Sequence, residues 1–160
     1  MTAAADLVAA LRARGWTIGV AESLTGGAVA AEIVTVPGAS TALRGAVVAY
    51  DTAIKHTLLG VDADLLAAHG PVHPRVAAQM ADGVRRALAV NGHPTDVGVS
   101  TTGIAGPDSP DGQPVGTVHI GVSAPSGTTT RAHRFTGSRE QIRAQARDAA
   151  IAAALQAARE

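Results

Sequence analysis

Short apolar runs that favour β-strands alternate with helical segments along this chain of 160 residues. The runs at residues 17–21 and 44–50 are typical of buried strands, and a third strand begins at 96–100. Residues 115–123 and 128–135 are β-rich as well, and the Ala-Pro-Ser-Gly sequence between them predicts an antiparallel hairpin. Strands that alternate with helices build layered folds. We therefore expect a three-layer α/β/α sandwich with a mixed, mostly parallel sheet.

Helices are expected between these strands and after the hairpin. Pro74 suits the first position of one of them, and Gly137 or Ser138 starts the last. The expected helices span residues 6–14, 28–36, 52–59, 74–88 and 138 to the end of the chain, and a short segment at 63–69 is broken by the Gly-Pro sequence that follows it. A chain of this length buries a single core, so we expect one domain over residues 1–160.

Composition excludes several classes of function. The 13 basic and 13 acidic residues cancel, which argues against nucleic acid or an anionic membrane as a partner. Cysteine is absent, so disulfides and thiolate metal sites are excluded, and a cytoplasmic location is expected. No apolar run is long enough for a membrane span, and the N-terminus does not resemble a signal peptide. Aromatic residues make up only 2% of the chain, which implies a core of small, closely packed side chains.

The turn after the first strand is the first candidate site. Ser23 lies there, followed by Thr25, Gly26 and Gly27, and a helix is expected to begin directly afterwards. The first turn of a helix leaves backbone N–H groups unpaired, and glycine lets a ligand approach them closely, so this turn can hold an anion or an oxyanion. The alternative is that Ser23 or Thr25 only caps the helix. Both interpretations stay open on the turn alone.

Tyr50 and Lys55 form a second candidate site. They are the only tyrosine and the only lysine of the chain and lie five residues apart, after the second strand. In open α/β sheets, ligands bind beyond the carboxyl ends of the parallel strands, so these residues, Ser23 and Thr102 should share one pocket. A lysine in a dry site loses its proton more readily and could activate Ser23. Otherwise Lys55 is a solvated helix residue and Tyr50 a core ring.

Metal and common nucleotide sites are not expected. His69 and His73 have the spacing of a helical metal pair, but the Gly-Pro sequence between them prevents a regular helix. The four aspartates of the loops are better explained as caps and turn residues: Asp62, Asp64, Asp108 and Asp111. The chain also has neither a Walker lysine nor a glycine-rich dinucleotide fingerprint.

Five ordered motifs resemble the CinA C-terminal-domain family of nicotinamide mononucleotide amidohydrolases. The resemblance runs from about Leu7 into the last helix. The matching segments are residues 21–27, 36–40, 47–50 with Lys55 and 59–61, 102–107, and 114–118. The larger members have an additional N-terminal domain, and the chain is similar to the stand-alone form.

The resemblance implies deamidation of nicotinamide mononucleotide, a small-molecule nucleotide, to nicotinate mononucleotide and ammonia, without metal or cofactor. Ser23 would be the nucleophile and Lys55 its base, assisted by Tyr50. Thr102 and backbone N–H groups near Gly103 would contact the substrate or the oxyanion. Thr25, Gly26 and Gly27 would bind the substrate, and Arg139 matches a basic residue of the family's closing motif. We expect Arg139 to bind the phosphate; otherwise it is a surface residue near the start of the last helix. Leu24, His73 and residues 108–111 depart from the family pattern. The alternative is a binding module of the same fold without turnover; a monomer and a homo-oligomer both stay open.

Overall fold

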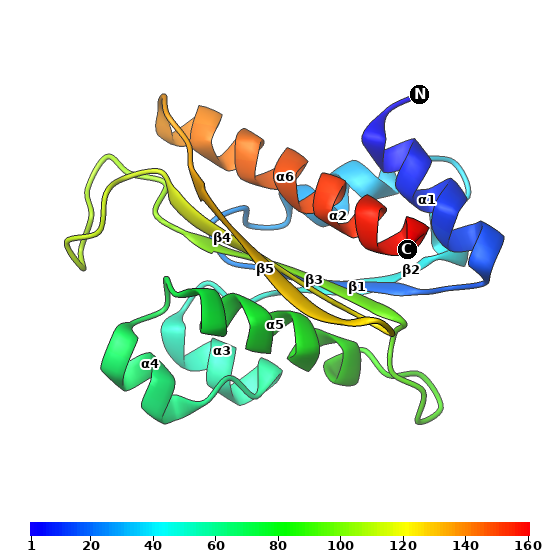
Figure 1. Cartoon of the computed structure of the whole chain (residues 1–160), viewed down its shortest axis with the longest axis horizontal. Coiled ribbons are helices and arrows are strands. Elements are labelled where there is room, and N and C mark those ends of the chain that lie inside the picture. Colours follow the sequence, from blue (N-terminus) through cyan, green and yellow to red (C-terminus); the bar gives the residue numbers. More distant parts are fainter.

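A five-stranded mixed sheet forms the centre of the computed structural model, which describes residues 1–160 (Figure 1). Its strands are β1 (Ile18–Glu22), β2 (Leu43–Val48), β3 (Val97–Gly103), β4 (Thr117–Ala124) and β5 (Gly127–Arg134). Their order across the sheet is β2-β1-β3-β4-β5. β1 is parallel to both β2 and β3, whereas β4 is antiparallel to β3 and to β5. The predicted mixed sheet and its terminal hairpin are confirmed.

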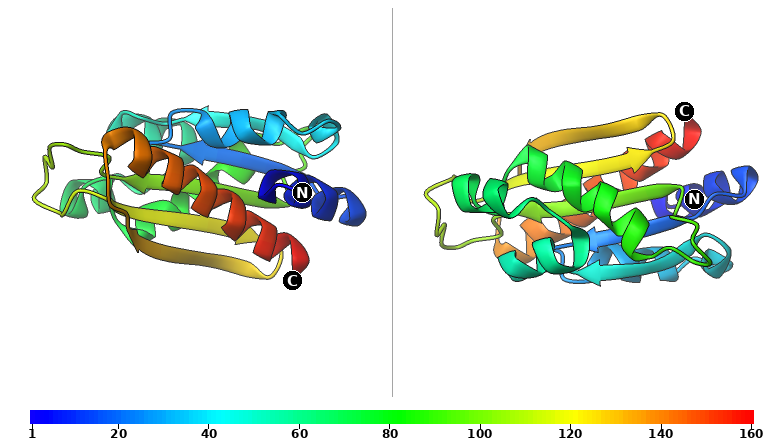
Figure 2. Two further views of the ribbon diagram at one scale, coloured as in Figure 1. Left: turned by 90° about the horizontal axis from the view of Figure 1, so that it is seen from above. Right: turned by 90° about the horizontal axis from the view of Figure 1, so that it is seen from below.

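Helices cover both faces of the sheet, which confirms the sandwich (Figure 2). One face carries α1 (Ala3–Arg14), α2 (Ala28–Val34) and α6 (Arg139–Arg159). The opposite face carries α3 (Thr52–Leu59), α4 (Ala63–His69) and α5 (Pro74–Ala87). A short 3₁₀ helix, η1 (Ala39–Thr41), leads into β2. No helix is both long and apolar enough to cross a membrane.

Small residues let the helices approach the sheet closely. A side chain on Gly121 of β4 would place its Cβ 2.3 Å from the Ala77 carbonyl oxygen of α5. At Gly98 of β3 the same atom would lie 2.1 Å from the Ala81 carbonyl oxygen. Both values are far below van der Waals contact, so α5 sits against β3 and β4 only because these positions are glycine. The close packing expected from the scarcity of aromatic residues is confirmed.

Most element boundaries agree with the sequence pattern. α3 has the predicted bounds, and the short segment at 63–69 forms the helix α4. α6 begins after the Ser138 cap, whose side chain accepts from the Gln141 N–H. α1 starts earlier than predicted because Thr2 caps it, and α2 ends earlier, at Val34. The prediction of a buried strand at residues 44–50 is wrong. β2 is an edge strand that ends at Val48. Every second residue is exposed because alternate side chains point to opposite faces of the sheet, and one of these faces is left uncovered along β2.

Candidate active site

Three segments meet around a cavity of about 580 Å³ at the carboxyl ends of the parallel strands. Ser23 follows β1, Lys55 lies on α3 beyond β2, and Thr102 lies near the end of β3. All three line the cavity, together with Gly103, Tyr50 and Arg139. Residues of the β3–β4 loop also line the cavity. Figure 1 shows this loop projecting from one end of the sheet. The structure therefore brings together the strand ends that the sequence pattern placed in one pocket.

Lys55 is buried and directed at Ser23. Its side chain is 1% exposed, and Nζ donates to Ser23 Oγ at 2.9 Å. Nζ also donates to the carbonyl oxygens of Ala49 at 2.6 Å and Tyr50 at 3.4 Å. Burial lowers the pKa of Lys55 from 10.5 to about 8, although the negative charge of Asp51 acts in the opposite direction. The interpretation of Lys55 as a solvated helix residue is wrong.

The turn that carries Ser23 is held by β3. The Ser23 N–H donates to the Thr101 carbonyl oxygen at 3.1 Å and approaches Thr101 Oγ1 at 3.2 Å. Thr25 is buried, and its hydroxyl bonds to the same Thr101 hydroxyl at 2.8 Å. Thr25 therefore fixes the turn and does not line the cavity, in contrast to its predicted role in substrate binding.

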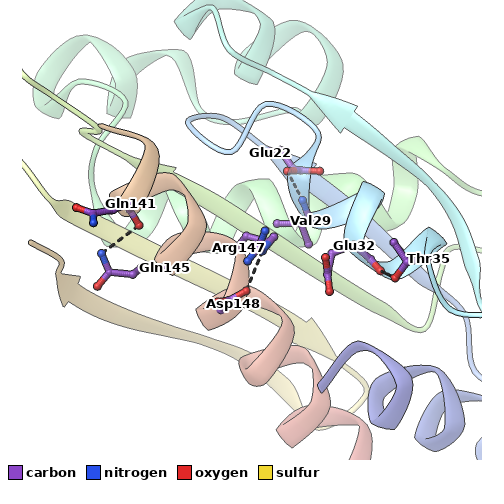
Figure 3. A network of polar contacts seen from close by, with 8 residues as sticks. All are labelled: Glu22, Val29, Glu32, Thr35, Gln141, Gln145, Arg147 and Asp148. Atoms are coloured by element: carbon purple, nitrogen blue, oxygen red, sulfur yellow. Dashed lines mark hydrogen bonds and ion pairs between the residues drawn. The ribbon is translucent and has the colours of Figure 1, made fainter. Parts of the chain in front are cut away.

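The N-terminus of α2 is occupied by a carboxylate of the chain itself. Glu22 is fully buried, and its side chain accepts from the N–H groups of Gly27 at 3.1 Å, Val29 at 2.9 Å and Ala30 at 3.0 Å. Figure 3 shows the contact with Val29. The Gly26 N–H donates to the Ser23 carbonyl oxygen. The expectation of unpaired N–H groups at Gly26 and Gly27 is therefore wrong, and neither glycine lines the cavity.

Tyr50 and Arg139 lie at the mouth of the cavity. The Tyr50 side chain is 63% exposed, so Tyr50 is not a core ring. Its hydroxyl accepts from Arg139 Nη2 at 3.4 Å, and only its carbonyl oxygen contacts Lys55. The structure thus shows no hydrogen bond from the phenol to Ser23 or Lys55. Arg139 Nη1 donates to the Gly106 carbonyl oxygen at 2.7 Å, which holds the guanidinium beside the cavity.

Thr102 and Gly103 form part of the cavity wall. The Thr102 hydroxyl donates to the Pro71 carbonyl oxygen at 2.7 Å, so its proton is already used and its lone pairs are free to accept. A side chain on Gly103 would collide with Thr117 and Val118 of β4, which explains glycine at this position. Gly103 therefore has a packing role in addition to its place on the cavity wall.

Two residues at the turn were missed by the sequence analysis. Glu22 is a carboxylate at the end of a buried strand, and such a group requires donors nearby. Arg143 reaches the turn from α6, with Nε donating to the Leu24 carbonyl oxygen at 2.8 Å and Nη2 to the Thr25 carbonyl oxygen at 3.2 Å. Arg143 lies one helical turn after Arg139, so both side chains are on one face of α6. This spacing could have indicated from the sequence that Arg143 also lies near the site.

Comparison of the sequence with models of protein families gives a match over nearly the whole chain. The model of the CinA C-terminal domain matches residues 1–158. The chain belongs to the CinA C-terminal-domain family. A CinA-like protein from Frankia casuarinae is 50% identical over 133 residues, which are 83% of this chain and 30% of that protein. This CinA domain spans about a third of the length of the curated relatives it matches.

Solved structures show the same fold over the whole CinA domain. A competence-damaged protein (CinA) superfamily protein from Klebsiella pneumoniae is 31% identical, with a TM-score of 0.91 over 98% of this chain and 96% of that one. The competence damage-inducible protein A (ComA) from another strain of the species is 33% identical, with a TM-score of 0.89 over 96% and 93% of the two chains. The fold resemblance inferred from the five motifs is confirmed.

Proposed function

We propose that the chain is an amidase that hydrolyses nicotinamide mononucleotide to nicotinate mononucleotide and ammonia. The observation that carries the proposal is the hydrogen bond of 2.9 Å between Lys55 Nζ and Ser23 Oγ inside the cavity. With a pKa of about 8, roughly a tenth of Lys55 is neutral at pH 7 and able to accept a proton. The resemblance of the motifs to nicotinamide mononucleotide amidohydrolases supports the choice of substrate.

The reaction follows from this pair. Ser23 Oγ attacks the carboxamide carbon and its proton passes to neutral Lys55, which makes Ser23 the nucleophile and Lys55 the general base. As the C–N bond breaks, Lys55 returns the proton to the departing nitrogen and ammonia leaves. Water then attacks the acyl ester with Lys55 again as the base, which frees the nicotinate product and restores Ser23.

Backbone geometry supports Gly103 as a donor to the oxyanion. The Ile104 N–H donates to the Thr117 carbonyl oxygen of β4. Successive N–H groups of an antiparallel strand point to opposite sides, so the Gly103 N–H points toward β1 and Ser23. The Ser23 carbonyl oxygen, the next acceptor on that side, is bonded to Gly26 instead. Thr102 Oγ1 can accept from the substrate amide, and Arg139 would bind the phosphate at the cavity mouth.

Ammonia release from nicotinamide mononucleotide by the purified chain tests the proposal, with the acid product identified by mass spectrometry. Ser23→Ala should lower the rate by about three orders of magnitude or more, because it removes the attacking oxygen. Ser40→Ala, a change of the same type at an exposed position, should leave the rate unchanged. Substrate binding without turnover in the wild type would favour a binding module instead.

A further inference from the structure

Arg143 is a cation with two carbonyl partners in the nucleophile turn, residues 23–27, and no carboxylate. Its Nε–Leu24 and Nη2–Thr25 contacts span 119 and 118 residues of sequence. The chain has two ion pairs, Arg147–Asp148 and Arg159–Asp6, and Arg143 takes part in neither. Arg143 is half-buried, and partial burial of a guanidinium costs desolvation energy. No ion pair offsets this cost, so the position of Arg143 needs another explanation.

The peptide between Leu24 and Thr25 connects Arg143 to the residues after Ser23. Leu24 and Thr25 are both buried, yet no hydrogen bond is made by the N–H of either. The Leu24 carbonyl and the Thr25 N–H belong to one planar peptide and point in opposite directions. A charged donor on this carbonyl therefore fixes the direction of the N–H and polarises it.

Gly26 lies directly beside this contact. A Cβ on Gly26 would lie 3.4 Å from Arg143 Nη2, and Gly26 has a φ of +59°, where a side chain is disfavoured. Glu22 binds the end of the same turn through the N–H group of Gly27 and the start of α2 through those of Val29 and Ala30. The turn is thus held at its carbonyls by a cation from α6 and at its N–H groups by an anion from β1.

We propose that Arg143 is a positioning residue of the nucleophile turn. By holding the Leu24 and Thr25 carbonyls, it fixes the path of the turn and so keeps Ser23 Oγ at Lys55. Arg143 does not touch the substrate and acts through the backbone of the turn. The inference rests on the proposed function for its kinetic effect, but the reactivity of Ser23 can be measured without the substrate.

The test compares Arg143→Met with Arg147→Met, a matched control one turn further along α6. Arg147 is also half-buried, but its side chain binds only Asp148 (Figure 3). Each variant is treated with a fluorophosphonate, and modification of Ser23 is followed by mass spectrometry; the Ser23 oxygen bonds to phosphorus and fluoride leaves. Circular dichroism and thermal unfolding report the folded fraction.

Arg143→Met should slow the labelling of Ser23 about 10- to 100-fold per folded molecule, the size of effect expected from a small displacement of a reacting group. In turnover of the mononucleotide, kcat should fall by a similar factor and KM should change less than about threefold. Arg147→Met should behave as the wild type. Arg143→Lys, which keeps the charge but cannot bind two carbonyls as a fork, should be intermediate, and it replaces Arg143→Met if that variant does not fold.

Equal labelling rates in the wild type and in the folded Arg143 variant would overturn the inference, and so would a loss that appears in KM alone. A wild-type chain whose Ser23 is not labelled would overturn it as well, because no activated nucleophile would then be positioned. A wild type that is labelled at Ser23 but does not hydrolyse nicotinamide mononucleotide would overturn the proposed substrate only. The labelling comparison would then still decide the role of Arg143.

Discussion

Lys55 Nζ lies 2.9 Å from Ser23 Oγ in a position that satisfies the lysine in both of its protonation states. As an ammonium, it has three donors for three oxygens, those of Ser23, Ala49 and Tyr50. As an amine, it keeps two donors for the carbonyls and accepts the Ser23 proton. A proton can therefore move between Ser23 and Lys55 without any change in the surrounding structure.

The rate of amide hydrolysis should follow the deprotonation of Lys55. Because the base form is the active one and the pKa is about 8, kcat/KM should rise about tenfold between pH 6 and 7 and level off above the pKa. The direction follows from burial, which disfavours the ammonium form. A pH–rate profile from pH 6 to 9.5 measures this, and a flat profile would exclude Lys55 as the base.

Asp51→Asn should move this pH profile to lower pH. The negative charge of Asp51 raises the pKa of Lys55, so its removal should lower that pKa and increase the rate at pH 7 relative to the wild type. Asparagine keeps the cap of α3, where the Asp51 side chain accepts from the Ala53 N–H at 2.8 Å. A midpoint that stays in place or moves to higher pH would show that Asp51 does not act on Lys55.

The sequence predicted that Ser23 and Lys55 meet, but it did not predict the residues that hold them in place. Ser23 and Lys55 could be found because both follow strands of a recognisable α/β pattern, and the ends of parallel strands meet at one edge. The direction of the Tyr50 side chain could not be predicted, since it depends on a contact with Arg139, 89 residues away. The exposure of β2 was missed because an apolar run does not reveal whether both faces of its strand will be covered.

The α2 N-terminus shows a different limit of sequence analysis. A glycine-rich turn before a helix predicts free N–H groups, and here the preceding Glu22 accepts from three such groups. Sequence spacing places Glu22 on β1, but the direction in which its side chain folds depends on the path of the turn. The same holds for Arg143, whose acceptors are backbone carbonyls and carry no sequence signature.

Glu22→Gln should destabilise the chain by about 1–3 kcal/mol. Both carboxylate oxygens of Glu22 accept from backbone N–H groups, and in glutamine the amide nitrogen, which is a donor, would replace one of these acceptors. The melting temperature should fall by about 2–4 °C for each kcal/mol. Glu32→Gln is the matched control on α2, since the Glu32 carboxylate binds no backbone N–H, and it should change stability by less than about 0.5 kcal/mol (Figure 3). Equal melting temperatures for both variants would show that the charge of Glu22 is not needed.

Arg139→Ala should raise KM for nicotinamide mononucleotide by about tenfold or more, because Arg139 is the only arginine on the cavity wall and suits a phosphate at its mouth. The riboside lacks the phosphate and should show little change, which separates phosphate binding from damage to the reacting end. Tyr50→Phe controls for the contact of 3.4 Å that the variant also removes. If kcat/KM fell equally for both substrates, the role of Arg139 would instead be to hold the β3–β4 loop through its hydrogen bond with the Gly106 carbonyl oxygen.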